Sequence, residues 1–178
     1  MISMESASTV GGAELARLEP SDGEALRRLF YRLSPETIYR RFHSPVVYPE
    51  QTQPQRLLDI DHHDREAVVA VVDGEIVGVA RYFRQPGGNA AELAVVVADA
   101  WQRQGLATRM LNALAQRARA ACIQRFTATV QPDNTPALAL LESFHPSAST
   151  LTQGQIVATV PIDSFESADL LAVHLHRA

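Results

Sequence analysis

Lysine is missing from this chain of 178 residues, and all 16 of its basic side chains are arginine. Genome base composition explains that preference without any functional role. Cys122 is the only cysteine, so no internal disulfide can form, which fits a reducing compartment. We expect Cys122 to be a small core residue. No apolar run approaches the roughly 20 residues of a membrane-spanning helix, and the N-terminal residues do not resemble a secretory signal. The sequence therefore predicts a cytoplasmic protein with no membrane partner.

Positive charge is also in short supply, because 20 acidic residues outnumber the basic ones and give a net charge of −4. A nucleic-acid partner is not expected at this charge, whereas a basic acceptor such as an amine would be tolerated. Hydrophobic residues make up 46% of the chain, which is enough for a substantial core. The length predicts a single domain over residues 1–178, with residues 1–12 as a flexible lead-in.

The most informative stretch runs from residue 90 to residue 111. Glu92–Val97 is apolar on both faces apart from Glu92, which predicts a strand in the middle of a sheet. A helical repeat follows at Leu106, Met110, Leu114 and Ala118. Small residues at Gly105 and Ala107 would let an anion approach the free N–H groups at the start of that helix. The stretch predicts a phosphate or pyrophosphate site, with an ordinary strand-to-helix turn as the alternative.

Hydrophobic periodicity elsewhere predicts the rest of an α/β domain. The Asp73-Gly74 pair favours a type I′ turn and therefore a hairpin. The expected helices are 23–33, one that starts at Ser34-Pro35-Glu36 and stops before Pro45, a short one between 49 and 59, and one starting near Thr135. The expected strands are 14–18, 66–72, 75–83, 125–130, 150–152 and 155–160. The tail from residue 164 to 178 fits either a helix or a strand.

These elements, in this order, resemble the coenzyme A-binding core of the GNAT superfamily of N-acetyltransferases. The likeness rests on Glu92 in the strand, Gln-x-x-Gly-x-Ala at 102–107, the following helix and strand, and Asn134 before the next helix. It covers roughly residues 66–141. It implies an α/β GNAT fold with a central mixed, mostly antiparallel sheet flanked by helices. It also implies acetyl-CoA as the cosubstrate, with no metal.

The resemblance assigns specific residues to the cofactor. In GNAT domains the central strand splays from the next strand, which would free the backbone of Val95 and Val97 to pair with the pantetheine arm. The N–H of Val95 would also stabilise the oxyanion of the reaction. Asn134 would contact the pantetheine, and helix capping is its alternative role. The pyrophosphate would bind the backbone of Arg103, Gln104, Gly105, Leu106, Ala107 and Thr108, while Gln102 would shape the loop.

Acetyl transfer to an amine needs a base, because an amine like that of lysine, with a pKa of about 10.4, is protonated at neutral pH. Glu92 is the candidate, since burial on an apolar strand would make its carboxylate more basic. The alternative is a solvated Glu92 paired with an arginine. Ala91-Glu92-Leu93-Ala94 and Leu33–Phe42 are similar to segments of Pat-type protein lysine acetyltransferases, in which this glutamate is the base. That resemblance implies a protein lysine as the acceptor.

Two positions depart from the GNAT pattern. Many members have a tyrosine seven residues after the asparagine, as the general acid for the departing thiolate, and here that position is Leu141. His145-Pro146 replaces the usual Gly-Phe. Either the thiolate leaves without a tyrosine donor, another group serves, or turnover is poor. A catalytically weak acyl-CoA sensor therefore stays open, as does a small-molecule amine acetyltransferase, which would share every motif.

Two further expectations concern metal and assembly. The paired histidines, His62-His63 and His174-x-His176, lack a supporting cluster of cysteines or carboxylates, so no metal site is expected. The loosely patterned C-terminal strands would leave a sheet edge that a partner could cover. A homodimer is therefore predicted, with a monomer as the alternative.

Overall fold

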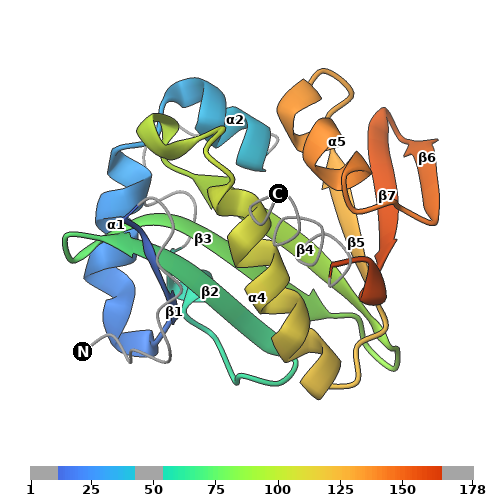
Figure 1. Cartoon of the computed structure of the whole chain (residues 1–178), viewed down its shortest axis with the longest axis horizontal. Coiled ribbons are helices and arrows are strands. Elements are labelled where there is room, and N and C mark those ends of the chain that lie inside the picture. Colours follow the sequence, from blue (N-terminus) through green and yellow to red (C-terminus); the bar gives the residue numbers. More distant parts are fainter. Residues whose placement is uncertain (1–11, 43–53, 166–178) are drawn as a thin grey trace, which may run out of the picture.

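The computed structural model describes residues 12–42 and 54–165. Its centre is one seven-stranded sheet in the order β1-β2-β3-β4-β5-β7-β6 (Figure 1). Neighbouring strands are antiparallel except for the parallel pair β4 and β5, so the predicted mixed, mostly antiparallel sheet is confirmed. The strands are β1 Glu14–Arg17, β2 Arg65–Val72, β3 Glu75–Arg84, β4 Ala90–Val97, β5 Arg125–Val130, β6 Ala148–Thr152 and β7 Gln155–Pro161.

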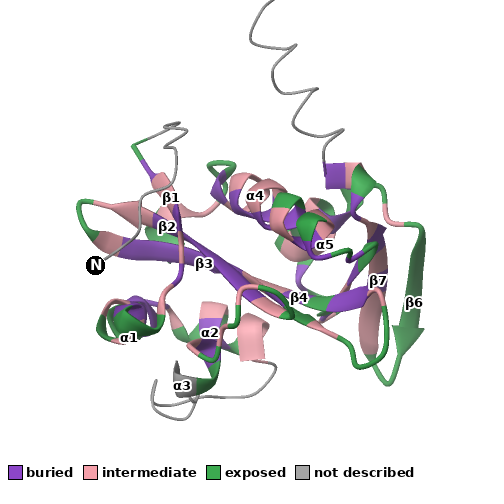
Figure 2. Cartoon of the chain, turned by 90° about the horizontal axis from the view of Figure 1, so that it is seen from below, coloured by how far each residue is buried: buried purple, intermediate pink, exposed green. Residues whose placement is uncertain are grey.

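Helices cover both faces of the sheet (Figure 2). On one face lie α1 Gly23–Tyr31, α2 Pro35–Phe42 and the short α3 Pro54–Leu57. On the other face lie α4 Leu106–Ala120 and α5 Thr135–Glu142. Two short 3₁₀ helices, η1 Pro20–Asp22 and η3 Asp99–Trp101, precede α1 and α4 in the chain. No helix among the described residues has the length and apolar character needed to cross a membrane.

Each face of the sheet has its own hydrophobic core. Between α4 and the sheet the buried side chains include Met110, Leu111 and Leu114 of α4 and Phe126 of β5. Between α1 and the sheet they include Leu26, Leu29 and Phe30 of α1 and Val79 of β3. Because alternate residues of β4 point to opposite faces, this central strand contributes to both cores. The nearly unbroken apolar pattern of the strand is therefore explained by its position.

Most predicted elements are present. Asp73 and Gly74 have φ angles of 49° and 78°, and a type I′ turn requires both to be positive. Strand β6 begins two residues before the predicted start. The predicted short third helix appears as α3, although residues 49–53 lie outside the described residues, as do residues 1–11 and most of the C-terminal tail. The prediction for Cys122 is wrong: it follows α4 with φ of 59°, and its side chain is exposed.

Strands β4 and β5 pair over a short distance and then separate. The ladder joins Ala90–Glu92 to Arg125–Thr127, although both strands continue beyond it. The N–H of Ala98 donates to the carbonyl of Val77 on β3 at 2.8 Å. Because backbone groups alternate sides along a strand, the N–H groups of Val95 and Val97 point away from β3, toward the gap. The splayed central strand predicted from the sequence is present.

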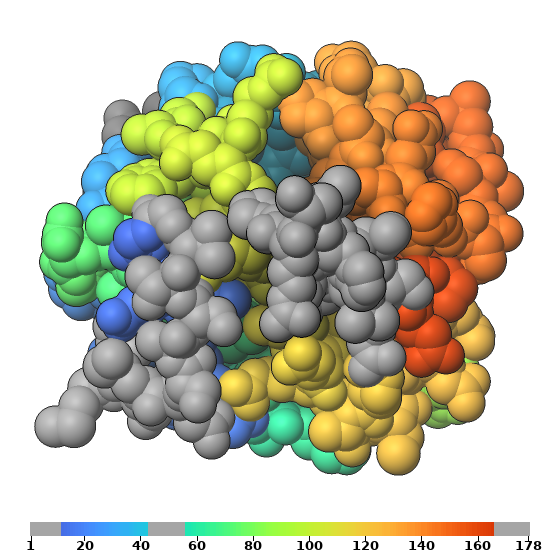
Figure 3. All heavy atoms as spheres, viewed as in Figure 1, coloured from blue at the N-terminus to red at the C-terminus, as the bar shows by residue number. Residues whose placement is uncertain are grey.

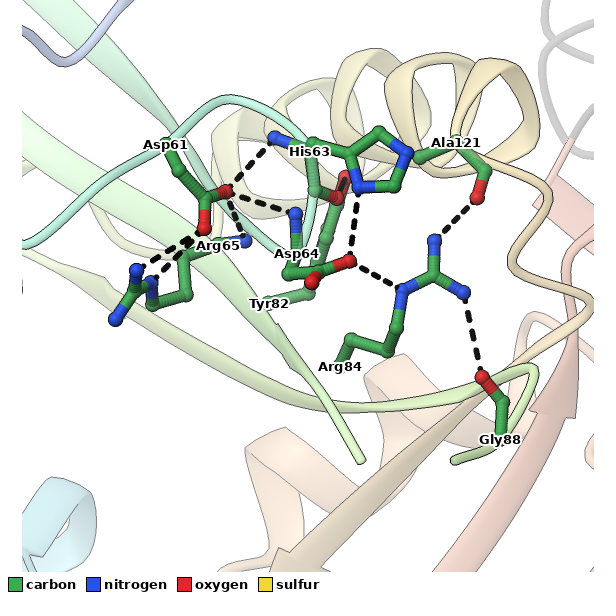
Figure 4. Close-up of polar contacts among 8 residues, drawn as sticks. All are labelled: Asp61, His63, Asp64, Arg65, Tyr82, Arg84, Gly88 and Ala121. Atoms are coloured by element: carbon green, nitrogen blue, oxygen red, sulfur yellow. Dashed lines mark hydrogen bonds and ion pairs between the residues drawn. The ribbon is translucent and has the colours of Figure 1, made fainter. Parts of the chain in front are cut away.

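A polar cluster fixes the opposite end of these strands (Figure 4). Arg84, at the end of β3, donates from Nε to Asp64 Oδ1 at 2.6 Å and also donates to the carbonyls of Gly88 and Ala121. Tyr82 donates from its hydroxyl to the carbonyl of His63 at 2.9 Å. These bonds link the loop before β2 to the β3–β4 turn and to the end of α4.

In the same cluster, the Asp61 carboxylate organises the turn that leads into β2. It accepts hydrogen bonds from the backbone N–H groups of His63, Asp64 and Arg65 at 3.0, 2.8 and 2.9 Å. Burial acts to raise the pKa of Asp61, but these backbone bonds and one from the Arg65 side chain outweigh it and lower the pKa to about 2. The ionised carboxylate is therefore the form that stabilises this turn.

We expect Asp61→Ala to lower the free energy of unfolding by about 1 kcal/mol at neutral pH, because exposed turn bonds of this kind are worth that much. The folded pKa lies below the unfolded value of 3.8, so this contribution is complete above about pH 4 and is lost as the pH falls toward 2. Urea unfolding of the wild type and of Asp61→Ala at pH 7 and pH 3 measures this difference in free energy. Asp163→Ala is the control, because that side chain is 94% exposed. A difference between Asp61→Ala and wild type that grows in acid would contradict this account.

Candidate active site

A cleft opens where β4 and β5 separate. It consists of two adjoining hollows of about 470 and 450 Å³. In Figure 3 the loop before α4 and helix α5 face each other across a hollow, with atoms of α2 deeper inside. The residues that line both hollows, and so mark their junction, are Arg40, Arg41, Val95, Asn134, Ala137 and Leu140. We call the hollow beside α4 the loop half and the hollow beside Glu92 the Glu92 half.

The loop half is lined by the residues between β4 and α4. Arg103 and Gly105 have φ angles of 60° and 75°, so two left-handed residues turn the chain into the helix. At the start of α4 the N–H of Arg109 donates to the carbonyl of Gly105 at 3.1 Å. A Cβ placed on Gly105 would contact nothing within 4 Å, so the space beside it is open. Unpaired N–H groups at the positive end of a 15-residue helix make a site suited to an anion.

Most of the predicted loop residues line the loop half. Those lining the loop half are Val97, Gln102, Arg103, Gly105, Leu106, Ala107 and Thr108. Gln104 does not line it; its side chain donates to the carbonyl of Ala100 at 2.9 Å and braces the turn. Val95 lies at the junction of the two halves, where its N–H points toward the gap.

Helix α2 is tied to this loop by a network that the sequence did not reveal. Gln102 donates from Nε2 to the carbonyl of Val97 at 3.0 Å and to Thr37 Oγ1 at 3.1 Å. Asp99 accepts from the Ser34 hydroxyl at 2.6 Å and from the Thr37 hydroxyl at 2.8 Å. Burial acts to raise the pKa of Asp99, but the bonds from Ser34 and Thr37 lower it overall. The ionised Asp99 therefore positions the start of α2 over the cleft.

The Glu92 half differs from the prediction in one respect. Glu92 lines it, but its side chain is exposed, so the expected burial is wrong and the argument from desolvation no longer applies. Glu92 lies opposite Phe83 on β3, on the sheet face away from α4. Within the described residues Glu92 makes no close hydrogen bond or ion pair, but its charge interacts with those of Arg41 and Arg81, so the alternative of a solvated glutamate beside an arginine stays open. The carboxylate is available to a ligand in the cleft.

Asn134 caps the N-terminus of α5, which is the alternative role predicted for it from the sequence. Its Oδ1 accepts from the N–H of Ala137 at 3.3 Å at the start of α5, and the residue is buried at the junction of the two halves. A ligand contact is compatible with this position. Leu141 is buried and lines the Glu92 half, so it has no group to protonate a thiolate. Tyr82 is held by His63 at the other end of β3, and Tyr39 is exposed on α2; neither lines the cleft.

The described residues hold no group of three or more histidine, cysteine, aspartate or glutamate side chains arranged to bind a metal. His62 contacts Glu66 at 2.9 Å and Glu19 at 3.5 Å, and His63 contacts Asp64 at 2.8 Å. Both histidines therefore take part in local polar pairs. His174 and His176 lie outside the described residues.

The sequence model of the Acetyltransferase (GNAT) family matches residues 29–145, and the chain belongs to this family. The Acetyltransferase Pat of Mycolicibacterium smegmatis is 34% identical over 119 residues, which cover 65% of this chain and 35% of that protein. The L-2,4-diaminobutyric acid acetyltransferase of Methylotuvimicrobium alcaliphilum is 35% identical over 88 residues, 48% of this chain and 51% of that protein. The chain thus spans between about a third and a half of the length of these relatives.

Among solved structures, the GNAT domain of S. lividans PAT superposes with a TM-score of 0.77 at 27% identity. The superposition covers 84% of this chain and 90% of that one. The GNAT fold expected from the sequence is therefore confirmed over most of the chain, and the likeness is to a Pat-type domain.

Proposed function

We propose that this domain transfers the acetyl group of acetyl-CoA to a primary amine, and that the amine is a protein lysine. The observation that carries the proposal is the separation of β4 from β5. It opens a cleft with a helix start suited to an anion in one half, an exposed carboxylate in the other, and the N–H of Val95 at the junction. GNAT acetyltransferases use acetyl-CoA, and the likeness to Pat proteins supports the lysine acceptor.

The loop half is suited to the coenzyme. Its pyrophosphate would accept hydrogen bonds from the N–H groups between Arg103 and Thr108, where the partial positive charge of α4 favours an anion. The pantetheine arm would then extend along β4 and pair with the backbone of Val95 and Val97, where β4 is no longer paired with β5. Asn134, at the start of α5, would contact the arm from the opposite wall.

The reaction would take place at the junction of the two halves. The amine nitrogen attacks the thioester carbonyl carbon and its proton passes to Glu92, directly or through a water molecule. The N–H of Val95 stabilises the oxyanion that forms. The intermediate then breaks its C–S bond, so that the amide remains on the acceptor and the thiolate of coenzyme A leaves. Because Leu141 offers no proton, we propose that the thiolate leaves unprotonated or takes a proton from solvent.

A specific observation favours each of two other functions. The absence of a tyrosine among the described residues that line the cleft is compatible with an acyl-CoA sensor of little activity. The relative named as a diaminobutyric acid acetyltransferase is compatible with a small amine acceptor. The experiment that separates them is incubation with acetyl-CoA and either lysine peptides or small diamines, followed by mass spectrometry. Acetylated peptides support the proposal, acetylated diamines the second alternative, and no product the sensor.

We also propose a homodimer formed through β6, the edge strand next to β7. All five residues of β6 are exposed, and Leu151 is 71% exposed. An open edge without charged side chains is prone to pair with another strand. Light scattering at a protein concentration of about tens of micromolar, on the order of the dissociation constant of a weak dimer, should give the mass of two chains. Leu151→Lys should reduce the measured mass to that of one chain. A monomeric wild type would contradict the dimer.

A further inference from the structure

The charges of two arginines, Arg41 and Arg81, interact with that of Glu92, and Arg41 lines the cleft with it. Resting on the proposed function, we propose that the amine acceptor carries a carboxylate close to its reacting nitrogen, and that Arg41 binds this carboxylate. Arg41 lines both halves of the cleft from α2. Arg81 lies on β3, where it pairs with Ala94 and is therefore the diagonal cross-strand neighbour of Glu92 on the same sheet face.

Glu92 is the anionic group whose charge acts on Arg41. Within the described residues Arg41 makes no hydrogen bond or ion pair, and its guanidinium lies over the ring of Phe42 at 4.9 Å. The adjacent Arg40 differs, because it is paired with Glu36 at 2.5 Å. Arg41 is only half-buried and borders the cleft, so a ligand there can reach it. An arginine can bind a carboxylate through two parallel N–H donors.

The local charge also favours an acidic acceptor. Burial lowers the pKa of Arg41 to about 10, with Arg81 acting in the same direction and Glu92 opposing it. Burial likewise lowers the pKa of Arg81. Arg41 nevertheless stays protonated at neutral pH, so two positive charges and one negative charge meet here. An ammonium group arriving alone would be repelled, whereas one that brings a carboxylate would be attracted.

The phosphates of the cofactor are the competing occupants, because Arg41 also lines the loop half. The electrostatic partners of Arg41 favour the acceptor: they are Glu92, which lines only the Glu92 half, and Arg81, its diagonal neighbour on β3. A role at the phosphates would appear as a loss of acetyl-CoA affinity when Arg41 is changed. A role at the acceptor would leave that affinity unchanged.

The test compares matched acceptors and variants. One peptide places lysine between two glutamates, and the other has glutamines in their place. For wild type, we expect kcat/KM to be about tenfold or more higher with the glutamate peptide, the usual size of a charge-assisted hydrogen bond. Arg41→Gln should abolish this preference and leave acetyl-CoA affinity unchanged by calorimetry. Arg27→Gln is the control, since Arg27 pairs with Glu24 on α1 and does not line the cleft.

A second pair of acceptors, γ-aminobutyrate and its amide, identifies the source of the carboxylate. A preference for γ-aminobutyrate alone supports a small amino acid, and a preference for the glutamate peptide alone supports an acidic side chain beside a protein lysine. Equal rates within both pairs, or a preference that survives in Arg41→Gln, would overturn the inference while the proposed function stands. Loss of acetyl-CoA binding in Arg41→Gln would assign Arg41 to the cofactor. No product from any of the four acceptors would overturn the proposed function itself.

Discussion

Glu92→Gln is expected to lower turnover by roughly 10²–10⁴-fold, the usual contribution of a general base. The substitution preserves size but removes the group that would accept the proton of the amine. Acetyl-CoA affinity should stay nearly unchanged, because the N–H groups of the α4 loop are not altered. The measurement is kcat from thiol release, together with the dissociation constant of acetyl-CoA from calorimetry.

The pH dependence makes this prediction more specific. An acceptor amine with a pKa of about 10.4 is increasingly neutral as the pH rises, so the loss caused by Glu92→Gln should shrink toward pH 9. Glu142→Gln is the control, since it changes an exposed glutamate that does not line the cleft. Turnover equal to wild type in Glu92→Gln across neutral pH would exclude Glu92 as the base. An equal loss of binding and turnover would indicate a structural role and favour the sensor.

The second large effect is expected at Gly105. Gly105→Glu would place a carboxylate in the open space beside the α4 N–H groups, where the pyrophosphate is proposed to bind. Two unit charges about 4 Å apart near a protein surface repel by about 1–4 kcal/mol. Acetyl-CoA affinity should therefore fall between about fivefold and several hundredfold in calorimetry.

Backbone strain at Gly105 needs a matched control, because its φ of 75° disfavours any side chain. Gly74→Glu supplies it: Gly74 has φ of 78°, a Cβ there would also contact nothing within 4 Å, and it lies in the β2–β3 turn. Gly74→Glu should match the loss of stability but keep wild-type affinity. Undiminished acetyl-CoA binding by a folded Gly105→Glu protein would remove the loop from the cofactor site.

Elements encoded by local chemistry could be predicted from the sequence. The Asp73-Gly74 turn, the Asn134 cap and the start of α4 after Gly105 each depend on neighbouring residues alone. The position of β4 at the centre of the sheet could also be predicted, because a strand with an apolar pattern on both faces needs cover on both sides.

Features that depend on distant segments could not be predicted. The exposure of Glu92 depends on which elements cover that end of the sheet, and no local pattern encodes this cover. Asp99 reaches residues 65 positions away at Ser34, so its role in fixing α2 has no signature in its own neighbourhood. Cys122 lies in an apolar segment, yet its left-handed backbone conformation directs the side chain out of the core.

The central claim is that acetyl-CoA occupies the cleft between β4 and β5, and a crystal structure of the complex tests it most directly. Pyrophosphate oxygens should lie about 2.7–3.2 Å from backbone nitrogens between Arg103 and Thr108. The thioester carbonyl oxygen should approach the nitrogen of Val95, with the Glu92 carboxylate on the acceptor side of that carbonyl. A cofactor bound outside the cleft, or with its thioester away from Val95 and Glu92, would contradict the account.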